Sequence, residues 1–319
     1  MLTIDGKRLD DPQRCYVIAE ASGNHAQDYA RAEALVYAAA DAGADAVKFQ
    51  TFTADEIAAA VPIPRGLGGA AHDAWLERLG AQTLRDLFAH GGLPRPWHFD
   101  LKRLAEMMGL AFLSTPFSLD AARFLVEEVQ VPALKIASGD LTFTPLLQYA
   151  ASTGLPILLS TGGAWLAEVQ HALHVISSQA QASTGVVVLQ CVSSYPCPPV
   201  ACNLRAIQTL QQRTLCDAVG WSDHTLDYEL IPALAVSYGA SVLEKHLKLE
   251  GDHESIDAAH SLSPSQFKRM VEVIRMVPLV LGSGVKEPQQ LEMHDRLFAR
   301  RDPSDWLRPQ MRGRLGDWE

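Results

Sequence analysis

The chain has 319 residues, a formal net charge of −10 and a hydrophobic fraction of 48%. This acidic balance, without any run rich in Lys and Arg, argues against nucleic acids and anionic membrane surfaces as partners. No apolar run reaches the roughly 18 residues of a membrane-spanning helix. Residues 1–10 lack the apolar segment of a secretory signal, and five cysteines without a Cys-x-x-Cys pair are typical of reduced thiols. We therefore expect a cytoplasmic protein.

Short apolar runs recur eight times along the chain, and a helix-like stretch follows each of them. The runs span residues 16–20, 46–50, 111–115, 133–138, 156–161, 186–191, 218–223 and 241–246. This alternation predicts an α/β protein with a single-domain (β/α)8 TIM barrel, in which the active site lies where the strands end. We expect residues 1–14 to be a polar lead-in, residues 15–281 to form the barrel, and residues 282–319 to be a short irregular tail.

Helices are predicted in the stretches between these runs. The first is expected over about residues 29–42, because this Ala-rich stretch stops at Gly43. Residues 53–95 are longer than an ordinary crossover, contain several Pro and Gly residues, and include a helical stretch near 75–88. We interpret this segment as a substrate-side flap, and an insertion without a role is the alternative. The other helices are expected near residues 96–108, 119–128, 144–152, 166–179, 203–214, 227–238 and 264–277.

Two histidines stand at the ends of neighbouring predicted strands. His224 follows the seventh run and His246 ends the eighth, so both imidazoles can converge at one rim of the barrel. Two convergent histidines with a nearby acid can bind a divalent metal, and nitrogen ligands favour Mn²⁺, Fe²⁺, Zn²⁺ or Co²⁺ over Ca²⁺. The alternative is that they are hydrogen-bonded filler of the barrel. His25, His253 and His260 are weaker candidates.

Lysines and hydroxyl groups end several other strands. Lys48 comes from the second run and Lys135 from the fourth, and the hydroxyl groups belong to Thr115, Ser138 and Ser160. Ammonium groups combined with hydroxyls and glycine-flanked amides form a cradle for phosphate and carboxylate groups. The sequence therefore predicts a binding site for a small anion inside an acidic protein.

The remaining candidates leave several roles open. Glu20 ends the first run and can act as an acid, a base or a ligand. Alternatively, the lysines pair with acids such as Glu20 and Glu244 in a structural network, or Lys135 forms a Schiff base as in barrel aldolases. Tyr195 lies in a Pro-rich loop after the sixth run, where it suits either a substrate hydroxyl or the capping of the core. Asp257, just after the eighth run, could reach the pocket.

Seven motifs at the strand ends occur in a fixed order. They are Ile18-Ala19-Glu20 with Asn24-His25, the run 43–52 ending in Lys48-Phe49-Gln50-Thr51-Phe52, Ser114-Thr115-Pro116-Phe117, Lys135-Ile136-Ala137-Ser138-Gly139-Asp140, Ser160-Thr161-Gly162, Ser222-Asp223-His224-Thr225 and Glu244-Lys245-His246. Over roughly residues 15–300 the chain resembles the sialic acid synthase family. That family includes N-acetylneuraminate, legionaminate and pseudaminate synthases and the spore-coat polysaccharide protein E group.

This resemblance implies a transferase of carbohydrate and polysaccharide biosynthesis. In the family, C3 of phosphoenolpyruvate adds to the aldehyde of an open-chain aldose, water adds at C2, and phosphate leaves by C–O cleavage. The product is a 2-keto-3-deoxy sugar acid. The implied cofactor is a divalent metal that acts as a Lewis acid, with Mn²⁺ expected first and Mg²⁺ or Co²⁺ as alternatives.

The resemblance also assigns roles to individual positions. The expected catalytic residues are Glu20, which matches a proton-handling glutamate, and His224 and His246, which match the metal ligands. Positions that hold phosphoenolpyruvate in the family match Lys48, Gln50, Thr115, Lys135, Ser138 and Ser160. Residues that contact the sugar match Tyr195, Asp257 and Ser193.

Three departures from the family pattern bear on the substrate. The segment Asn24-His25-Ala26-Gln27 lacks the family's usual glycine, and Ser193 stands where sialic acid synthases place asparagine. We also expect no C-terminal antifreeze-like domain, although residues 297–302 resemble the linker into it. We therefore hypothesise an acceptor other than N-acetylmannosamine. A Schiff-base aldolase and a non-catalytic sugar-binding homologue are the alternatives, and a homodimer through the barrels stays open.

Overall fold

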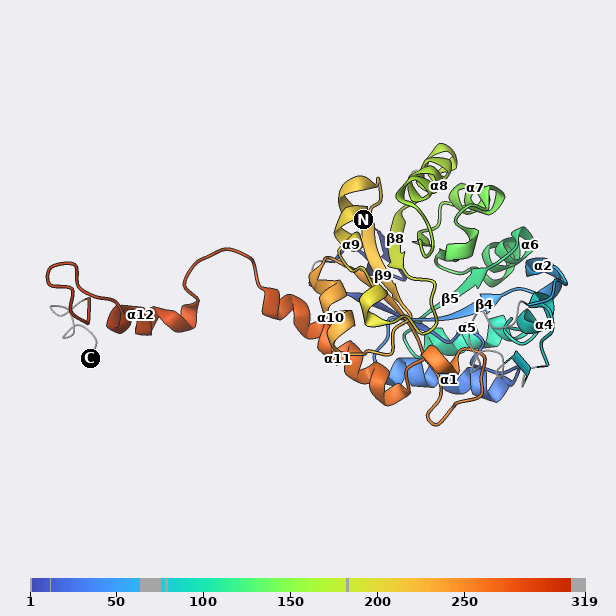
Figure 1. Ribbon diagram of the computed structural model, residues 1–319, viewed down its shortest axis with the longest axis horizontal. Helices are drawn as coiled ribbons and strands as arrows, with labels where there is room; N and C mark the ends of the chain where they lie inside the picture. Colours follow the sequence, from blue (N-terminus) through green and yellow to red (C-terminus); the bar gives the residue numbers. More distant parts are fainter. Residues whose placement is uncertain (1, 12, 64–75, 78–79, 182–183, 311–319) are drawn as a thin grey trace. The chain divides into compact units, whose positions relative to one another are not determined.

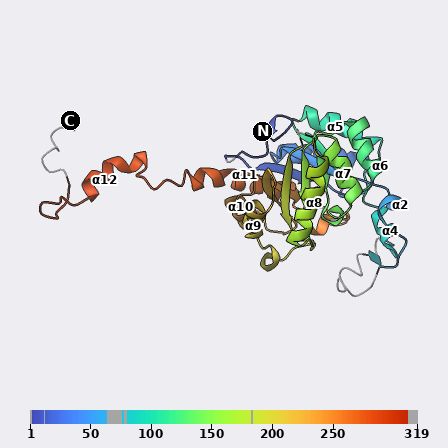
Figure 2. The ribbon, with the colours of Figure 1, turned by 90° about the horizontal axis from the view of Figure 1, so that it is seen from above.

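The computed structural model describes residues 2–11, 13–63, 76–77, 80–181 and 184–310. The chain divides into two compact units, Met1–Val280 and Leu281–Glu319. The first unit contains a parallel sheet with helices around its outer face (Figures 1 and 2). Within the described ranges, no helix is long and apolar enough to cross a membrane.

The sheet has eight parallel strands in the order β5-β4-β3-β10-β9-β8-β7-β6. The two strands at the ends of this order, β5 and β6, pack against each other and bring the sheet close to a complete barrel. This arrangement confirms the prediction of a (β/α)8 barrel. The sequence could predict it because strands that are buried on both faces appear as short apolar runs. The strands are β3 Tyr16–Glu20, β4 Ala46–Thr51, β5 Ala111–Pro116, β6 Leu134–Ile136, β7 Ile157–Ser160, β8 Val186–Cys191, β9 Ala218–Asp223 and β10 Val242–His246.

Helices follow the strands and cover the sheet (Figure 1). The helix α1 begins after Asp28, whose carboxylate accepts hydrogen bonds from the first turn, and it ends at Gly43 with φ of +82°. The principal helices are α1 Tyr29–Asp41, α5 Trp97–Met107, α6 Leu119–Arg123, α7 Thr144–Ser152, α8 Leu166–Gln179, α9 Ala206–Arg213, α10 Leu230–Ser237 and α11 Pro264–Leu281.

Two predicted helix starts were wrong, and a third predicted helix is present in two parts. The helix expected from residue 203 begins at Ala206, since Asn203 adopts a left-handed conformation with φ of +47°. The helix expected from residue 227 begins at Leu230, because the Asp227 carboxylate accepts hydrogen bonds from the amides of Glu229 and Ile231. The helix expected over 119–128 continues after α6 as the π-helix Phe124–Val129.

Two hydrophobic clusters separate the inside of the barrel from its outer layer. The outer cluster joins the outward side chains of the strands to the helices. The inner cluster holds alternate strand residues, as the two-residue period of a strand requires. Its members from the strands and their starts are Tyr16, Ile18, Ala46, Ala111, Leu113, Ala133, Leu158, Val187, Leu189 and Val242.

A short hairpin packs against this inner cluster. It consists of β1 Thr3–Ile4 and β2 Lys7–Arg8, and it buries the side chains of Leu2, Ile4 and Leu9. These residues contact the starts of the strands, the end of the barrel opposite the predicted site. Sequence reasoning treated residues 1–14 as a lead-in and did not identify the hairpin, because two-residue strands leave no clear alternation.

The described part of the segment 53–95 includes the short helices α2 Ala54–Ile57 and α4 Leu84–Phe88 and a bridge between Pro62 and Thr83. Of the helical stretch predicted near 75–88, residues 75, 78 and 79 lie outside the described residues, and the described part is helical at 76–77 and in α4. The interpretation of 53–95 as a flap stays a prediction. The second unit includes the helix α12 Met293–Ala299.

We expect Gly220→Ala to destabilise the barrel by about 1–3 kcal/mol. Gly220 lies on β9 inside the barrel, where an added Cβ would overlap the Leu189 side chain and the Val242 carbonyl oxygen. The comparison is thermal unfolding beside Gly139→Ala, whose added Cβ would meet no atom within 4 Å. Equal melting temperatures of the two variants would contradict this account of the barrel interior.

Candidate active site

Because side chains alternate along a strand, one set of polar residues points into the barrel at the carboxyl ends of the strands. Each of these residues lies two or four positions after an inner-cluster or adjoining residue of its own strand, so it faces the same interior. The strand register places Glu20 beside Lys48 on one side and His246 on the other. The inward set is Glu20, Lys48, Gln50, Thr115, Lys135, Ser160, Cys191, Ser222, Glu244 and His246.

Four buried charges form the centre of this set. Lys48 Nζ lies 2.6 Å from Glu20 Oε2 and 3.6 Å from Glu244 Oε2, while Lys135 Nζ lies 3.4 Å from Glu244 Oε1. All four side chains are at most 5% exposed. The cluster is electrically balanced, because two ammonium groups face two carboxylates.

The four charges titrate differently because their surroundings differ. Burial raises the pKa of Glu20 to about 7, and the nearby Glu244 charge adds to this effect while Lys48 opposes it. Burial alone would also raise the pKa of Glu244, but Lys135 and Lys48 lower it to about 2. Burial lowers the pKa of Lys135, whereas Glu20 and Glu244 outweigh burial and raise the pKa of Lys48. Glu20 is therefore the carboxyl group of the cluster that can exchange a proton near neutral pH.

Hydroxyl groups lie at the ends of the neighbouring strands, and one of them contacts Lys48. Lys48 Nζ donates a hydrogen bond to Thr115 Oγ1 over 2.9 Å, and Ser138 Oγ accepts one from the Gly162 amide over 2.9 Å. Ser160 Oγ is buried and has no hydrogen-bond partner among the described residues. An added Cβ at Gly162 would overlap the hydroxyl of Ser193, so the loops after β6, β7 and β8 meet here. Buried cations with available hydroxyls suit an oxyanion.

A hydrogen-bonded chain links Glu20 to the loop after β10. Gln50 Nε2 lies 3.1 Å from Glu20 Oε1 and 2.8 Å from Ser22 Oγ. Ser22 in turn donates to Asp257 Oδ2. Predicted members of the phosphoenolpyruvate and sugar contacts, Gln50 and Asp257, thus belong to one polar network.

Imidazole rings gather beside the charged cluster. The ring centroids of His224 and His246 lie 5.5 Å apart, and His260 lies 4.5 Å from His246. The Tyr195 ring packs on His224 at a centroid distance of 4.2 Å and is 55% exposed. His260 was only a weak candidate in the sequence analysis, but in the structure its ring lies beside those of His224 and His246. Of the other weak candidates, His25 is buried against Trp97 and Phe49, and His253 is exposed.

The two predicted metal ligands have the chemistry that a divalent ion requires. His224 Nδ1 lies 2.8 Å from the Val192 carbonyl oxygen, which can only accept, so this nitrogen carries the proton and Nε2 keeps its lone pair. Burial and the neighbouring imidazoles hold the pKa of His246 well below its ordinary value, and its Nδ1 has no hydrogen-bond partner among the described residues. Both rings therefore suit a first-row divalent metal.

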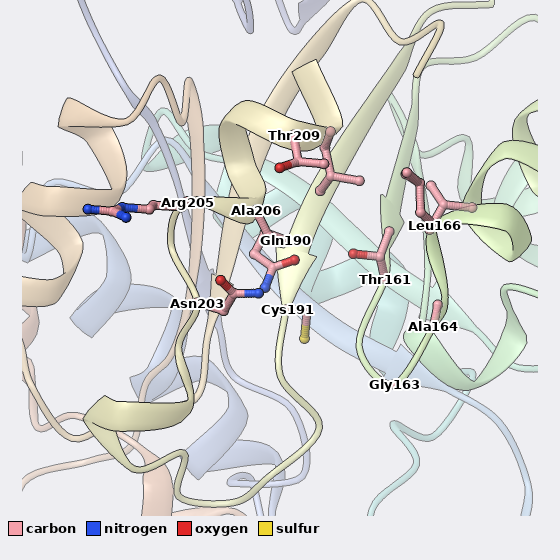
Figure 3. Close-up of a pocket in the computed structure, with 12 residues that line it drawn as sticks. Thr161, Gly163, Ala164, Leu166, Gln190, Cys191, Asn203, Arg205, Ala206 and Thr209 are labelled. Atoms are coloured by element: carbon pink, nitrogen blue, oxygen red, sulfur yellow. The ribbon is translucent and has the colours of Figure 1, made fainter. Parts of the chain in front are cut away.

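A pocket of about 320 Å³ begins beside this group. It lies between the end of β8 and the loop after β7 on one side and the helices α8 and α9 on the other (Figure 3). Cys191 and Thr161 line it, whereas Arg205 extends away from the other labelled side chains. The pocket provides space next to the polar end of the barrel.

One buried ion pair near the strand ends lies on the outer side of the sheet, away from the barrel interior. Lys245 Nζ lies 2.9 Å from Asp223 Oδ2, and both side chains are fully buried on the outer side of their strands. Lys245 also donates to the Thr225 carbonyl oxygen over 2.5 Å. Its neighbours Glu244 and His246 point inward because of the strand period, so Lys245 has a structural role.

A parallel barrel with buried lysines, carboxylates and imidazoles at the carboxyl ends of its strands has the architecture of a barrel enzyme, whose active site lies at that end. The NeuB family profile matches residues 35–286, and the chain belongs to the NeuB family.

Named relatives of this family are sugar acid synthases. The chain is 38% identical to N,N'-diacetyllegionaminic acid synthase of Legionella pneumophila, over 90% of this chain and 79% of the relative. It is 34% identical to pseudaminic acid synthase of Helicobacter pylori, over 89% of this chain and 81% of the relative. The structure of N-acetylneuraminic acid synthetase from Leptospira borgpetersenii, in complex with citrate, matches with a TM-score of 0.78 and 30% identity, over 92% of this chain and 94% of that one.

Proposed function

We propose that the protein condenses phosphoenolpyruvate with an aldose to give a 2-keto-3-deoxy sugar acid and inorganic phosphate. The observation that carries this proposal is the pair of buried lysines, one of them in contact with the Thr115 hydroxyl group, beside a cluster of imidazoles. A trianionic substrate needs cations where it binds, and an aldehyde needs polarisation where it reacts. The family supports the same reaction.

Lys48 and Lys135 bind the phosphate and carboxylate groups in this proposal. Both ammonium groups are buried, so their attraction for an anion is only weakly screened by water. Thr115, Ser138 and Ser160 supply the hydroxyl groups of the cradle. When the substrate binds, its anionic groups compete with Glu20 for Lys48, which favours the protonated form of Glu20.

The proposed reaction forms one carbon–carbon bond and one carbon–oxygen bond from water, and it breaks the carbon–oxygen bond to phosphate. C3 of phosphoenolpyruvate attacks the aldehyde carbon, and Glu20 donates a proton to the aldehyde oxygen as it becomes a hydroxyl group. Water supplies a hydroxyl group at C2, and its other proton returns to the Glu20 carboxylate. The C2–O bond to phosphate then breaks, the C2 hydroxyl group loses its proton to the departing phosphate, and the 2-keto acid is left.

His224 and His246 would hold the divalent metal in this proposal, and their imidazole nitrogens suit a first-row divalent ion such as Mn²⁺. A bound divalent ion supplies Lewis acidity to the aldehyde oxygen. The two histidines also fix the position of the aldehyde relative to the cradle, because both come from ends of adjacent strands.

The sugar end of the site is proposed to contain Tyr195, Ser193 and Asp257. Tyr195 can contact a sugar hydroxyl, since its ring is held on His224 while more than half of the side chain remains accessible. The pocket of Figure 3 offers room for a substituent of the acceptor. Because Ser193 is shorter than asparagine, we propose an acceptor other than N-acetylmannosamine.

Phosphate release from phosphoenolpyruvate tests the proposal directly. We expect release that depends on Mn²⁺ and on one aldose from a panel of acylated and plain sugars, and that EDTA abolishes. Absence of release with every sugar, together with absence of metal binding, would favour a non-catalytic sugar-binding homologue. A wide preference for N-acetylmannosamine would contradict the proposed acceptor.

A Schiff-base aldolase is the second candidate, and the lowered pKa of the buried Lys135 favours it, since an imine requires a neutral amine. Against it, Glu244 lies 3.4 Å from the ammonium group and favours its charged form. Borohydride treatment in the presence of pyruvate separates the two reactions in the same preparation. Covalent labelling of Lys135 would support the aldolase, and we expect none.

A further inference from the structure

A third imidazole lies beside the two histidines at the strand ends. His260 ends the short 3-10 helix Ala258–His260 and is 5% exposed. Its ring centroid lies 6.3 Å from that of His224 and 4.5 Å from that of His246. Its Nε2 atom is buried and has no hydrogen-bond partner among the described residues. A buried ring nitrogen without a partner is unusual in a folded protein, because it loses its hydrogen bonds to water.

A carboxylate completes the surroundings of this nitrogen. Asp257 Oδ1 lies 3.5 Å from His260 Nε2, while Asp257 Oδ2 is held by the Ser22 hydroxyl group and the Gly23 amide. One candidate ligand atom from each of His246, Asp257 and His260 lies within 4.8 Å of the others. Two imidazoles and one carboxylate therefore converge, with the carboxylate already oriented from its far side.

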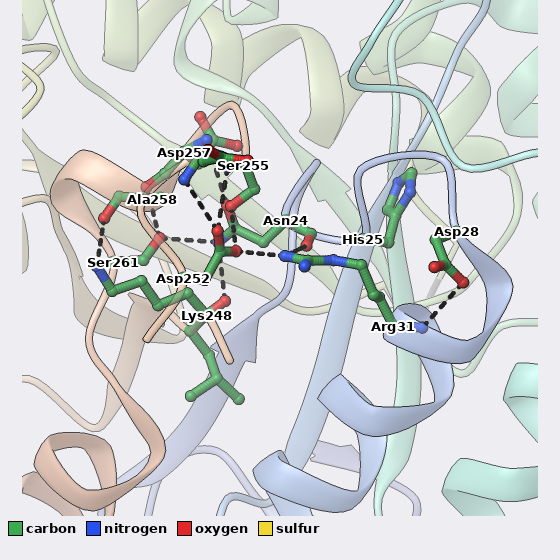
Figure 4. Close-up of polar contacts among 12 residues, drawn as sticks. Asn24, His25, Asp28, Arg31, Lys248, Asp252, Ser255, Asp257, Ala258 and Ser261 are labelled. Carbon is green, nitrogen blue, oxygen red and sulfur yellow. Dashed lines mark hydrogen bonds and ion pairs between the residues drawn. The ribbon is translucent and has the colours of Figure 1, made fainter. Parts of the chain in front are cut away.

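The loop that carries Asp257 and His260 is fixed by the loop after β3 (Figure 4). Asn24 Oδ1 lies 3.2 Å from the Asp257 amide, and Asn24 Nδ2 donates to Ser261 Oγ over 2.8 Å. Arg31 pairs with Asp252 over 2.5 Å, and Lys248 Nζ donates to the Ala258 carbonyl oxygen over 2.9 Å. These contacts hold the loop at positions before and after Asp257 and His260 in the sequence. Such support keeps metal ligands in a fixed orientation.

We propose that His260 is a ligand of the divalent metal, together with His246 and one carboxylate oxygen of Asp257, beside the His224 ligand expected from the strand ends. The centre then receives ligands from the loop after β10 as well as from the barrel rim. A larger set of nitrogen donors favours Mn²⁺, Co²⁺ or Zn²⁺ over Mg²⁺. The inference rests on the proposed function for the presence of the metal, but it is measured without either substrate.

Titration of the full chain with Co²⁺ tests the assignment. Binding is followed by visible absorption of the ion and by competition with a chromophoric chelator. We expect His260→Ala and the bulkier His260→Gln to bind Co²⁺ at least about 10-fold more weakly than the unchanged chain and with an altered spectrum. His253→Ala is the matched control, because this exposed histidine lies on the same loop, and it should bind like the unchanged chain.

The outcomes separate this inference from the proposed function. Wild-type affinity and an unchanged spectrum in both His260 variants would overturn it, even if phosphate release remained metal-dependent. Loss of Co²⁺ binding in these variants would support it, even if no sugar gave phosphate release. X-ray absorption of the Co²⁺-loaded wild-type chain counts imidazole ligands independently of variant folding: three would support His260 as a ligand, and two would overturn it.

Discussion

Glu20→Gln should lower kcat for phosphate release by about 10²- to 10⁴-fold, the usual effect of removing a positioned proton donor. The amide keeps the size of the side chain and can still contact Lys48 and Gln50. It has no carboxyl proton to give to the aldehyde oxygen. Because the Lys48 ammonium group remains, the affinity for phosphoenolpyruvate should change much less than kcat.

The pH dependence of kcat/KM, which reports the protonation state of the free enzyme, gives the sign of this effect. Burial and the neighbouring Glu244 raise the pKa of Glu20 to about 7, and the proposed donor is the protonated form. Activity of the wild-type chain should therefore be fully present below this pKa and fall as pH rises through about 7. The Glu20→Gln variant cannot lose this proton, so that falling limb should be absent from its profile.

Glu128→Gln provides the control for removal of one negative charge, because Glu128 is exposed on the outer layer of the barrel. Its kcat and pH profile should match those of the wild-type chain. If Glu20→Gln kept the falling limb and most of its activity, another group would have to supply the proton. Thermal unfolding of both variants checks that the fold is retained.

The strand ends could be predicted from sequence because two simple rules act together. Buried parallel strands appear as apolar runs, and active-site residues of a barrel lie at the carboxyl ends of those runs. Glu20, Lys48, Lys135 and His246 follow from these rules. The pairing of Lys48 and Lys135 with Glu20 and Glu244, which the sequence offered as an alternative, is also present. The strand period distinguishes Glu244, two residues before the inward His246, from its neighbour Lys245.

Other parts of the site depend on contacts that no local pattern contains. His260 reaches His246 only because the loop after β10 packs on Asn24 and Arg31, which are more than 220 residues away in sequence. The N-terminal hairpin likewise becomes part of the core through Ile4 and Leu9, although its strands are only two residues long. The position of His260 and the burial of the hairpin both depend on long-range packing of loops. Hydrophobic periodicity contains no information about such packing.

Lys135→Met should both abolish phosphate release and destabilise the barrel by about 3–5 kcal/mol. The substitution keeps an unbranched side chain of similar length but removes the cation that lies 3.4 Å from Glu244. Among the described residues, Lys48 is then the one ammonium group in an ion pair with the buried Glu244 carboxylate, at 3.6 Å. The cradle also loses one of its two cations for the substrate.

The double variant Lys135→Met/Glu244→Gln separates these two consequences. It removes one positive and one negative charge, so Lys48 and Glu20 remain as a balanced pair 2.6 Å apart. Most of the lost stability should return, because a neutral pair of similar volume carries no uncompensated buried charge. Phosphate release should stay undetectable, because neither change restores a cation for the substrate.

Chemical denaturation and the phosphate assay on the same preparations measure both effects. The exposed pair Arg269 and Glu229 is the control, because breaking it with Arg269→Met/Glu229→Gln should change stability by no more than about 1 kcal/mol and leave activity intact. Recovery of activity along with stability in the Lys135 double variant would mean that the buried lysine only balances the charge of Glu244. Recovery of stability alone places Lys135 on the substrate and explains why a barrel would keep two lysines in its interior.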